Sequence, residues 1–169
     1  MKLQIRDPQR SDAQALVDLF SKLDSETSFM LFEPGERMTT VDAQKERIFE
    51  FNEAENRQMF VACHGEYVVG VIVGNGGGMS RNQHSVQIAI GVEKAFSGLG
   101  VGFQLMQGIE SWAQAKQLHR MELTVMTHNS AAIALYEKCG FQQEGRKRHS
   151  LKVNGDYVDE LLMAKLLTA

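Results

Sequence analysis

The sequence has few cysteines, little excess charge and no long apolar run, and each shortage excludes a class of protein. Its two cysteines, Cys63 and Cys139, lie far apart without CxxC or Cys/His spacing. Neither a disulfide framework nor a zinc site is therefore expected. The formal net charge is only -3, and no block of Lys and Arg forms the basic stripe typical of nucleic-acid binders. We expect no nucleic-acid partner.

The chain also lacks the segments that would direct it to a membrane. No stretch approaches the roughly 18 apolar residues that a membrane-spanning helix needs, and the start MKLQIRDPQR has no apolar signal-peptide core. We expect a soluble, cytoplasmic protein with no membrane partner. At 169 residues, with 43% hydrophobic and 23% charged residues, residues 1–169 are expected to form one globular domain with a sizeable core.

Alternating polarity predicts strands, and helical spacing of apolar residues predicts helices. The expected strands are residues 2–6, 59–64, 67–74, 84–92, 120–125, 141–153 and 157–166. The expected helices are a first one capped at Ser11 and reaching Asp24, a second from Thr39 or Thr40 to about Ala54, a long one after a glycine loop, and a short one from Asn129 to Cys139. Asn154-Gly155 is a strong signal for a two-residue hairpin turn.

This order, βααβββαβαββ, predicts an α/β (α+β) fold with a mixed central sheet of about seven strands. The β-α-β passage from residue 84 to residue 125 supplies the parallel pair, and helices are expected on both faces. We expect the strand at 157–166 to lie at an edge of the sheet, where it could pair with a second copy in a homodimer.

The glycine loop Ser97-Gly98-Leu99-Gly100-Val101-Gly102 stands where a strand turns into a helix. Backbone N–H groups can converge on an anion there, and the helix dipole favours negative charge. A nucleoside triphosphate loop needs Gly-Lys-Ser/Thr at its end, but this chain has Val101-Gly102-Phe103. A dinucleotide fingerprint needs a third glycine where Phe103 stands, so an NAD-dependent oxidoreductase is disfavoured. A pyrophosphate held by backbone amides remains.

Two motifs in succession resemble the GNAT superfamily of acyl-CoA-dependent N-acyltransferases. Residues 97–102 match its Q/R-x-x-G-x-G/A phosphate loop at Gly100 and Gly102, with Ser97 in place of the first Gln or Arg. The stretch NSAAIALYEKCGF, residues 129–141, matches N-x-x-A-x-x-x-Y-x-x-x-G-F throughout. The resemblance covers essentially the whole chain and is sharpest from about residue 85 to residue 141.

The resemblance implies a cosubstrate, acetyl-CoA, and no metal. It implies a sheet that splays in the middle, between the strands at 85–92 and 120–125, so that pantetheine inserts as a surrogate strand. The backbone of Ile90 and Val92 would hold the pantetheine arm, and Asn129 and Tyr136 would also contact the cofactor. The pyrophosphate would bind the amides of Gly98, Leu99, Gly100, Val101, Gly102 and Phe103.

Aminolysis of a thioester also needs a proton donor for the leaving thiolate and an acceptor for the amine proton. By resemblance Tyr136 is the general acid, although its ring could instead simply pack under the strand after Phe141. Asn129 is also an excellent helix N-cap. The candidates for the base are Glu33 and Glu36, in the loop that borders the acceptor site in this family, and His84 and Gln87 on the adjoining strand. Glu33 is the one that we predict, although a solvated surface role is open to each of them. Much of the rate could come from positioning alone.

The amine acceptor is not readable from the sequence. The acidic loop residues Glu26, Glu33 and Glu36 fit a small primary amine or polyamine, and an open groove would equally fit a protein or peptide amine. The alternative from another class is a non-catalytic acyl-CoA-binding regulatory module that kept the phosphate loop.

Overall fold

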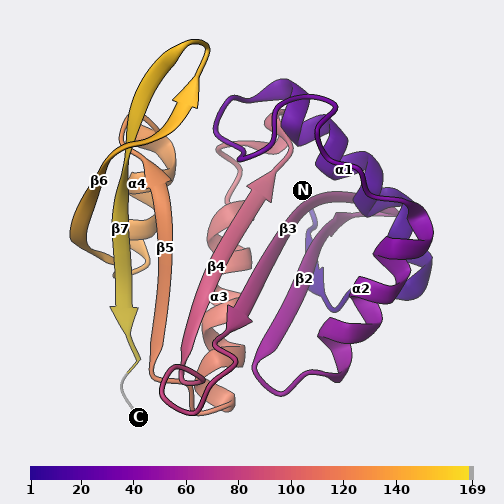
Figure 1. Cartoon of the computed structure of the whole chain (residues 1–169). Helices are drawn as coiled ribbons and strands as arrows, with labels where there is room; N and C mark the ends of the chain where they lie inside the picture. The colour runs from indigo at the N-terminus through magenta and orange to yellow at the C-terminus, as the bar shows by residue number, and fades with distance from the viewer. Residues whose placement is uncertain (168–169) are drawn as a thin grey trace.

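A computed structural model describes residues 1–167 and shows one seven-stranded sheet with helices on both faces (Figure 1). The strands are β1 (Gln4–Arg6), β2 (Arg57–His64), β3 (Tyr67–Gly76), β4 (Ser85–Val92), β5 (Arg120–Met126), β6 (Gln142–Val153) and β7 (Asp156–Leu166). The helices are α1 (Ala13–Glu26), α2 (Val41–Glu53), α3 (Val101–Ala115) and α4 (Ser130–Lys138). The predicted element order and the mixed sheet are confirmed.

Two boundaries depart from the sequence prediction because the chain uses short 3-10 turns. The first helix does not begin at a Ser11 cap: a 3-10 turn, Arg10–Asp12, precedes α1. The Asp12 carboxylate accepts a hydrogen bond from the Gln9 N–H at 2.6 Å. A second 3-10 turn, Lys94–Phe96, separates β4 from the glycine loop. The second helix begins as predicted, with the Thr40 hydroxyl accepting from the Ala43 N–H.

The sheet order is β1-β2-β3-β4-β5-β7-β6, in which only the β4/β5 pair is parallel. The prediction that the strand at 157–166 is an edge is therefore wrong. This strand, β7, pairs antiparallel with β5 on one side and with β6 on the other. Returning after the hairpin, β7 takes the inner place beside β5, and β6 becomes the edge. A dimer through a β7 edge is excluded.

The sheet is split between β4 and β5, as predicted. These strands pair over three positions only, Ser85↔Arg120, Val86↔Met121 and Gln87↔Glu122, and beyond them they diverge (Figure 1). By contrast, β3 and β4 stay paired from Gly70↔Val92 to Gly76↔Val86. The split leaves one long side of β4 without a strand partner.

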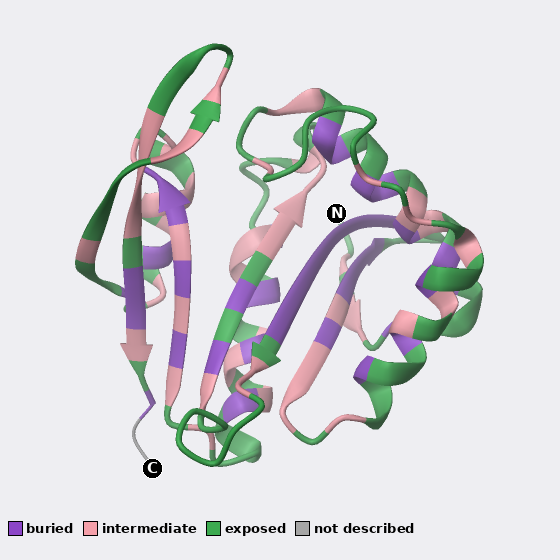
Figure 2. Ribbon diagram, viewed as in Figure 1, coloured by how far each residue is buried: buried purple, intermediate pink, exposed green. Residues whose placement is uncertain are grey.

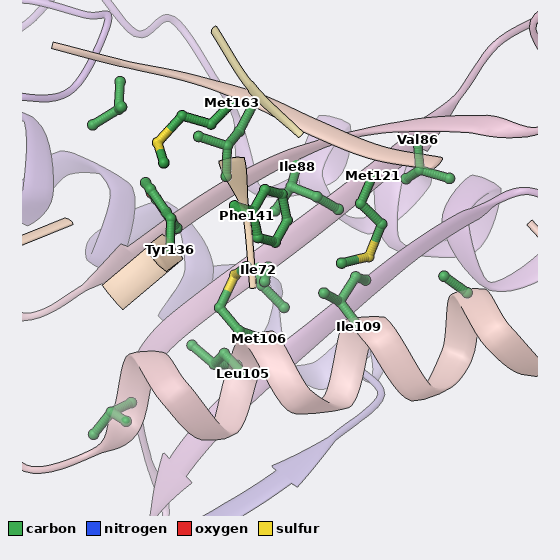
Figure 3. Close-up of a cluster of buried hydrophobic side chains, with 14 of the residues drawn as sticks. Ile72, Val86, Ile88, Leu105, Met106, Ile109, Met121, Tyr136, Phe141 and Met163 are labelled. Atoms are coloured by element: carbon green, nitrogen blue, oxygen red, sulfur yellow. The ribbon is translucent and has the colours of Figure 1, made fainter. Parts of the chain in front are cut away.

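Each face of the sheet has its own apolar core (Figure 2). On one face α1 and α2 pack on β2 and β3 through residues such as Leu16, Ile48 and Val71. On the other face α3 lies across β2, β3 and β4, and Leu105, Met106 and Ile109 are fully buried there (Figure 3). The same core includes Tyr136 of α4. The core on the α3/α4 face therefore spans both halves of the split sheet, whereas α1 and α2 cover β2 and β3.

Candidate active site

A cleft of about 1070 Å³ lies at the split between β4 and β5. Its lining comes from both faces of the sheet. On the α1/α2 face it includes Phe20, Leu23 and Val71, and on the α3/α4 face it includes Gly102 and Tyr136. Two molecules can therefore enter from opposite faces and meet inside the sheet.

The free side of β4 exposes backbone groups of alternate residues. The Glu93 N–H donates to the Val69 carbonyl of β3 at 2.9 Å, whereas the His84 carbonyl accepts from the His119 N–H on the β5 side. The backbone N–H and C=O groups of successive strand residues point to opposite sides of the strand. Those of the even-numbered residues of β4 therefore face the split. Ile90 and Val92 line the cleft, and their main chains form an open strand edge.

The glycine loop forms the end of the cleft at the start of α3. Gly98 and Gly100 take left-handed φ angles of 73° and 83°, a conformation that disfavours other residues. The Gln104 N–H is the first to reach a helical carbonyl, that of Gly100 at 3.1 Å. The N–H groups of residues 101–103 consequently lack helical partners, as at any helix start. Such a start is a ready anion site.

The surroundings of the loop favour a phosphate-bearing ligand. The first turn of α3 contains no acidic residue. Lys94 and Lys138 line the cleft beside the loop, and the Lys138 ammonium lies 4.4 Å from the centroid of the Phe103 ring. Gly98, Gly100, Val101, Gly102 and Phe103 all line the cleft. Leu99 does not, and its side chain is exposed, so only its backbone is available to a ligand.

Asn129 and Tyr136 project from the same side of α4, seven residues apart, and both line the cleft. The Asn129 side chain accepts a hydrogen bond from the Ala132 N–H at 3.3 Å, so its capping role is confirmed. Gly140, with φ of 90°, ends the segment, and the Phe141 N–H donates to the Tyr136 carbonyl. The Asn129 cap and the turn at Gly140 therefore fix the position of Tyr136.

Tyr136 is buried, and its ring centroid lies 6.1 Å from that of Phe141 (Figure 3). Its ring does pack in the core, yet within residues 1–167 its hydroxyl has no hydrogen-bond partner. Burial raises the pKa of the Tyr136 phenol to about 12, and the neighbouring Cys139 adds to the rise. The phenol therefore stays protonated at neutral pH and can only donate a proton.

Glu33 lies apart from Tyr136. It is exposed and lines an adjoining recess of about 270 Å³ between the loop after α1 and the β6/β7 hairpin. Its own N–H donates to the Glu36 carboxylate at 2.9 Å, which makes Glu36 part of the loop structure. Glu26 is also engaged, because its carboxylate accepts from the Lys94 N–H at 2.6 Å. The structure does not bring Glu33 into the cleft that contains Tyr136.

Sequence reasoning missed two arginines in the cleft, Arg37 and Arg47. Arg47 stands between Gln44, Ile48 and Phe51, the buried side of α2. Because Arg47 lies on the same stripe of the helix as these buried residues, the sequence pattern could have indicated that it faces the protein. The many charged residues of the helix obscured this pattern.

Other classes of site find no support in the described residues. Across residues 1–167 no group of three or more His, Cys, Asp or Glu side chains is arranged to hold a metal ion. None of the helices in this part of the chain combines the length and apolar character that a membrane crossing requires.

The chain matches known proteins over most of its length. The model of the Acetyltransferase (GNAT) family matches residues 17–141. L-amino acid N-acetyltransferase AaaT of Escherichia coli is 35% identical over 111 residues, which are 64% of this chain and 68% of that protein. A GNAT-family acetyltransferase from Streptococcus pneumoniae superposes with a TM-score of 0.95 at 27% identity, covering 99% of this chain and all of the other.

Similar structures include two that were solved with acetyl-CoA. YncA of Salmonella typhimurium, solved with its cofactor acetyl-CoA, superposes with a TM-score of 0.87 at 18% identity, covering 98% of this chain and 94% of that one.

Proposed function

This chain belongs to the GNAT family of acetyltransferases, and from that premise we propose that it moves the acetyl group of acetyl-CoA directly to a primary amine of a small molecule or peptide. It is an acetyl-CoA-dependent acetyltransferase; direct transfer and the kind of amine are the proposal. The observation that carries it is the cleft through the split sheet, whose two linings let donor and acceptor meet without a covalent enzyme intermediate. This geometry also disfavours a purely cofactor-binding module.

The α3/α4 side of the cleft fits acetyl-CoA. The open edge of β4 at Ile90 and Val92 can pair with the amides of a pantetheine chain as a neighbouring strand would. The free amides at the start of α3, with Lys94 and Lys138 beside them, suit a pyrophosphate. Acetyl-CoA supplies an activated acetyl group as a thioester.

Tyr136 is our proposed general acid. The residue lines the cleft, and its hydroxyl keeps its proton because burial raises its pKa to about 12. A departing thiolate, whose conjugate acid resembles cysteine with a pKa of about 8.5, is the group to which the phenol would donate as the bond breaks. The raised pKa works against this role, because it makes the phenol of Tyr136 a weaker acid than the thiol. Positioned proton transfer of this kind is worth roughly 10²- to 10⁴-fold in rate.

Glu33 stays a prediction as the base. From the adjoining recess it would act through water rather than by direct contact with the amine. The Escherichia coli relative is named for L-amino acids, which are small primary amines. That name supports a small amine over a protein lysine as the acceptor.

The test is thiol release from acetyl-CoA across a panel of amino acids, polyamines, aminoglycosides and short peptides. We expect amine-dependent release that falls at least tenfold in Tyr136→Phe, with acetyl-CoA affinity unchanged by calorimetry because only a hydroxyl is removed. Tyr67→Phe, at an exposed tyrosine of β3, is the matched control and should match wild type.

Three results would count against the proposal. Equal rates in wild type and Tyr136→Phe would remove the tyrosine from the chemistry. Bound acetyl-CoA with no release for any amine would refute transfer to small amines and peptides. A Glu33→Gln variant with an unchanged rate would remove Glu33 as the base.

A further inference from the structure

The acceptor side of the cleft carries two arginines among apolar side chains. On the α1/α2 face the apolar lining includes Phe20, Leu23 and Val73, and Arg37 and Arg47 stand beside them. A guanidinium at an apolar wall is stable only if it is paired or kept available to a ligand. Whether each arginine already has an ion-pair partner within the protein therefore determines whether it can bind a ligand on this side of the cleft.

Arg37 is already neutralised. Its Nε and Nη2 donate to the two oxygens of the Asp24 carboxylate at 2.8 Å and 3.0 Å. Asp24 is almost fully buried, and the guanidinium also lies over the rings of Phe20 and Phe32, at 4.6 Å and 4.2 Å from their centroids. This ion pair is a fixed part of the wall.

Arg47 has no such partner. No carboxylate of residues 1–167 lies within 4.0 Å of its guanidinium, and no hydrogen bond joins it to those residues. Its guanidinium carbon lies over the Phe51 ring, 5.6 Å from the ring centroid. Burial lowers the pKa of Arg47, and the positive charges of Arg37 and Arg57 lower that pKa further. The folded protein therefore keeps a charge in an unfavourable place.

The other charged groups on this side of the cleft are already engaged. Glu26 binds the Lys94 N–H. Glu160 accepts a hydrogen bond from the Ser150 hydroxyl at 2.8 Å and lies 3.7 Å from the Lys147 ammonium. Glu50, one turn from Arg47, contributes attraction but stays beyond ion-pair distance. Within the described chain, Arg47 is the one cation on the acceptor lining that has no carboxylate partner.

We propose that the acceptor is a small amine that also carries a carboxylate, and that Arg47 binds that carboxylate. This inference rests on the proposed function, because it places the anion on the side opposite acetyl-CoA. Planar guanidinium and carboxylate groups pair through two parallel hydrogen bonds, which fix orientation as well as position. An acceptor that is bound through its carboxylate keeps its amine free to reach the thioester. A hydrogen bond to a charged group of this kind changes affinity by about tenfold to hundredfold.

The carboxylate could come from a free amino acid or from the C-terminus of a short peptide, and matched compounds separate the two. The probes are L-phenylalanine, L-phenylalaninamide and phenethylamine, which share a ring and an amine and differ in the acid group, with glycyl-L-phenylalanine as the peptide. The kcat/KM for each is compared per unit of unprotonated amine, because the amines differ in basicity. We expect L-phenylalanine to exceed phenethylamine by at least tenfold.

The variants are Arg47→Gln, Arg47→Lys and, as matched control, Arg57→Gln. Arg57 also lies over the Phe51 ring, at 5.2 Å, but outside the cleft lining. Arg47→Gln should raise KM for L-phenylalanine at least tenfold with little change in kcat, and it should leave phenethylamine kinetics unchanged. Arg47→Lys should restore part of the preference, and Arg57→Gln should match wild type.

The result that overturns the proposal is a wild type that uses phenethylamine as well as L-phenylalanine, or an Arg47→Gln that loses both equally. A binding measurement distinguishes a failure of catalysis from a failure of this proposal. If no amine is acetylated, calorimetry of L-phenylalanine against phenethylamine, in the presence of CoA, still reports the carboxylate preference and its loss in Arg47→Gln. Equal binding of the two compounds would then reject the proposal.

Discussion

At the scale of single residues, Gln44 is the least satisfied polar group in the described chain. It is 1% exposed on the core side of α2, and neither its amide nitrogen nor its amide oxygen has a hydrogen-bond partner. An unpaired buried polar group costs about 1–3 kcal/mol. Replacement by methionine, similar in length and in helix propensity, should raise the free energy of unfolding by about that amount, measured by urea denaturation.

Gln107→Met is the control for this substitution, because Gln107 is exposed in the middle of α3 and should leave stability within about 0.5 kcal/mol of wild type. A loss of stability in Gln44→Met would contradict the expectation. It would indicate that a buried water satisfies the amide and is displaced with it.

Which residues form the site could be foreseen only where the signal is local. Asn129 caps α4, Tyr136 follows two turns later on the same side, and both line the cleft. Both were predicted as cofactor contacts from the match of residues 129–141 to the family motif. Arg47 belongs to no such motif, and its place on the buried stripe of α2 indicates only that the residue is partly buried. What distinguishes it from the other arginines is the absence of a partner, and pairing depends on residues distant in the sequence, as the Arg37 and Asp24 pair shows.

At the scale of elements, the glycine loop can be tested one residue at a time. Gly100 is the N-cap of α3 with φ of 83°, and a Cβ there would meet no protein atom within 4 Å. Gly100→Ala should therefore lose about 1–2 kcal/mol of stability from backbone strain alone. It should also bind acetyl-CoA more weakly, because the added methyl projects into open space beside the phosphate site. Urea denaturation and calorimetry measure the two effects.

Gly155→Ala is the matched control for the loop. Gly155 has φ of 86° and equally open surroundings, but it lies in the β6/β7 turn. The Gly155→Ala variant should lose a similar amount of stability and keep full affinity for acetyl-CoA. If both variants kept that affinity, the loop would not be the phosphate cradle.

The sequence predicted the turns best, and it predicted the order of the strands within the sheet worst. Asn154 and Gly155 both take positive φ, of 50° and 86°, because a two-residue hairpin requires them. The place of β7 between β5 and β6 was missed. A hairpin fixes which two strands pair, but not which of them turns toward the rest of the sheet. The split after Gln87 was expected from family resemblance alone, since no residue of β4 marks it.

At the scale of the whole molecule, the protein is two half-sheets joined at one end. Strands β1 to β4 form one half and β5 to β7 the other, with three residue pairs between them. A ligand that pairs with the open edge of β4 would add the missing contacts. Binding at 100 times the dissociation constant would also stabilise the folded state by about 2.7 kcal/mol.

Amide hydrogen exchange tests this picture along β4. Because Ile90 and Val92 face the split, their N–H groups should exchange quickly in the free protein and slow markedly when acetyl-CoA is bound. The Gly91 N–H, which faces β3, should be protected in both states. Alternating protection would show that the ligand occupies the position of a strand. A uniform slowing of all three amides would instead indicate general stiffening, and no change would place the pantetheine arm elsewhere in the cleft.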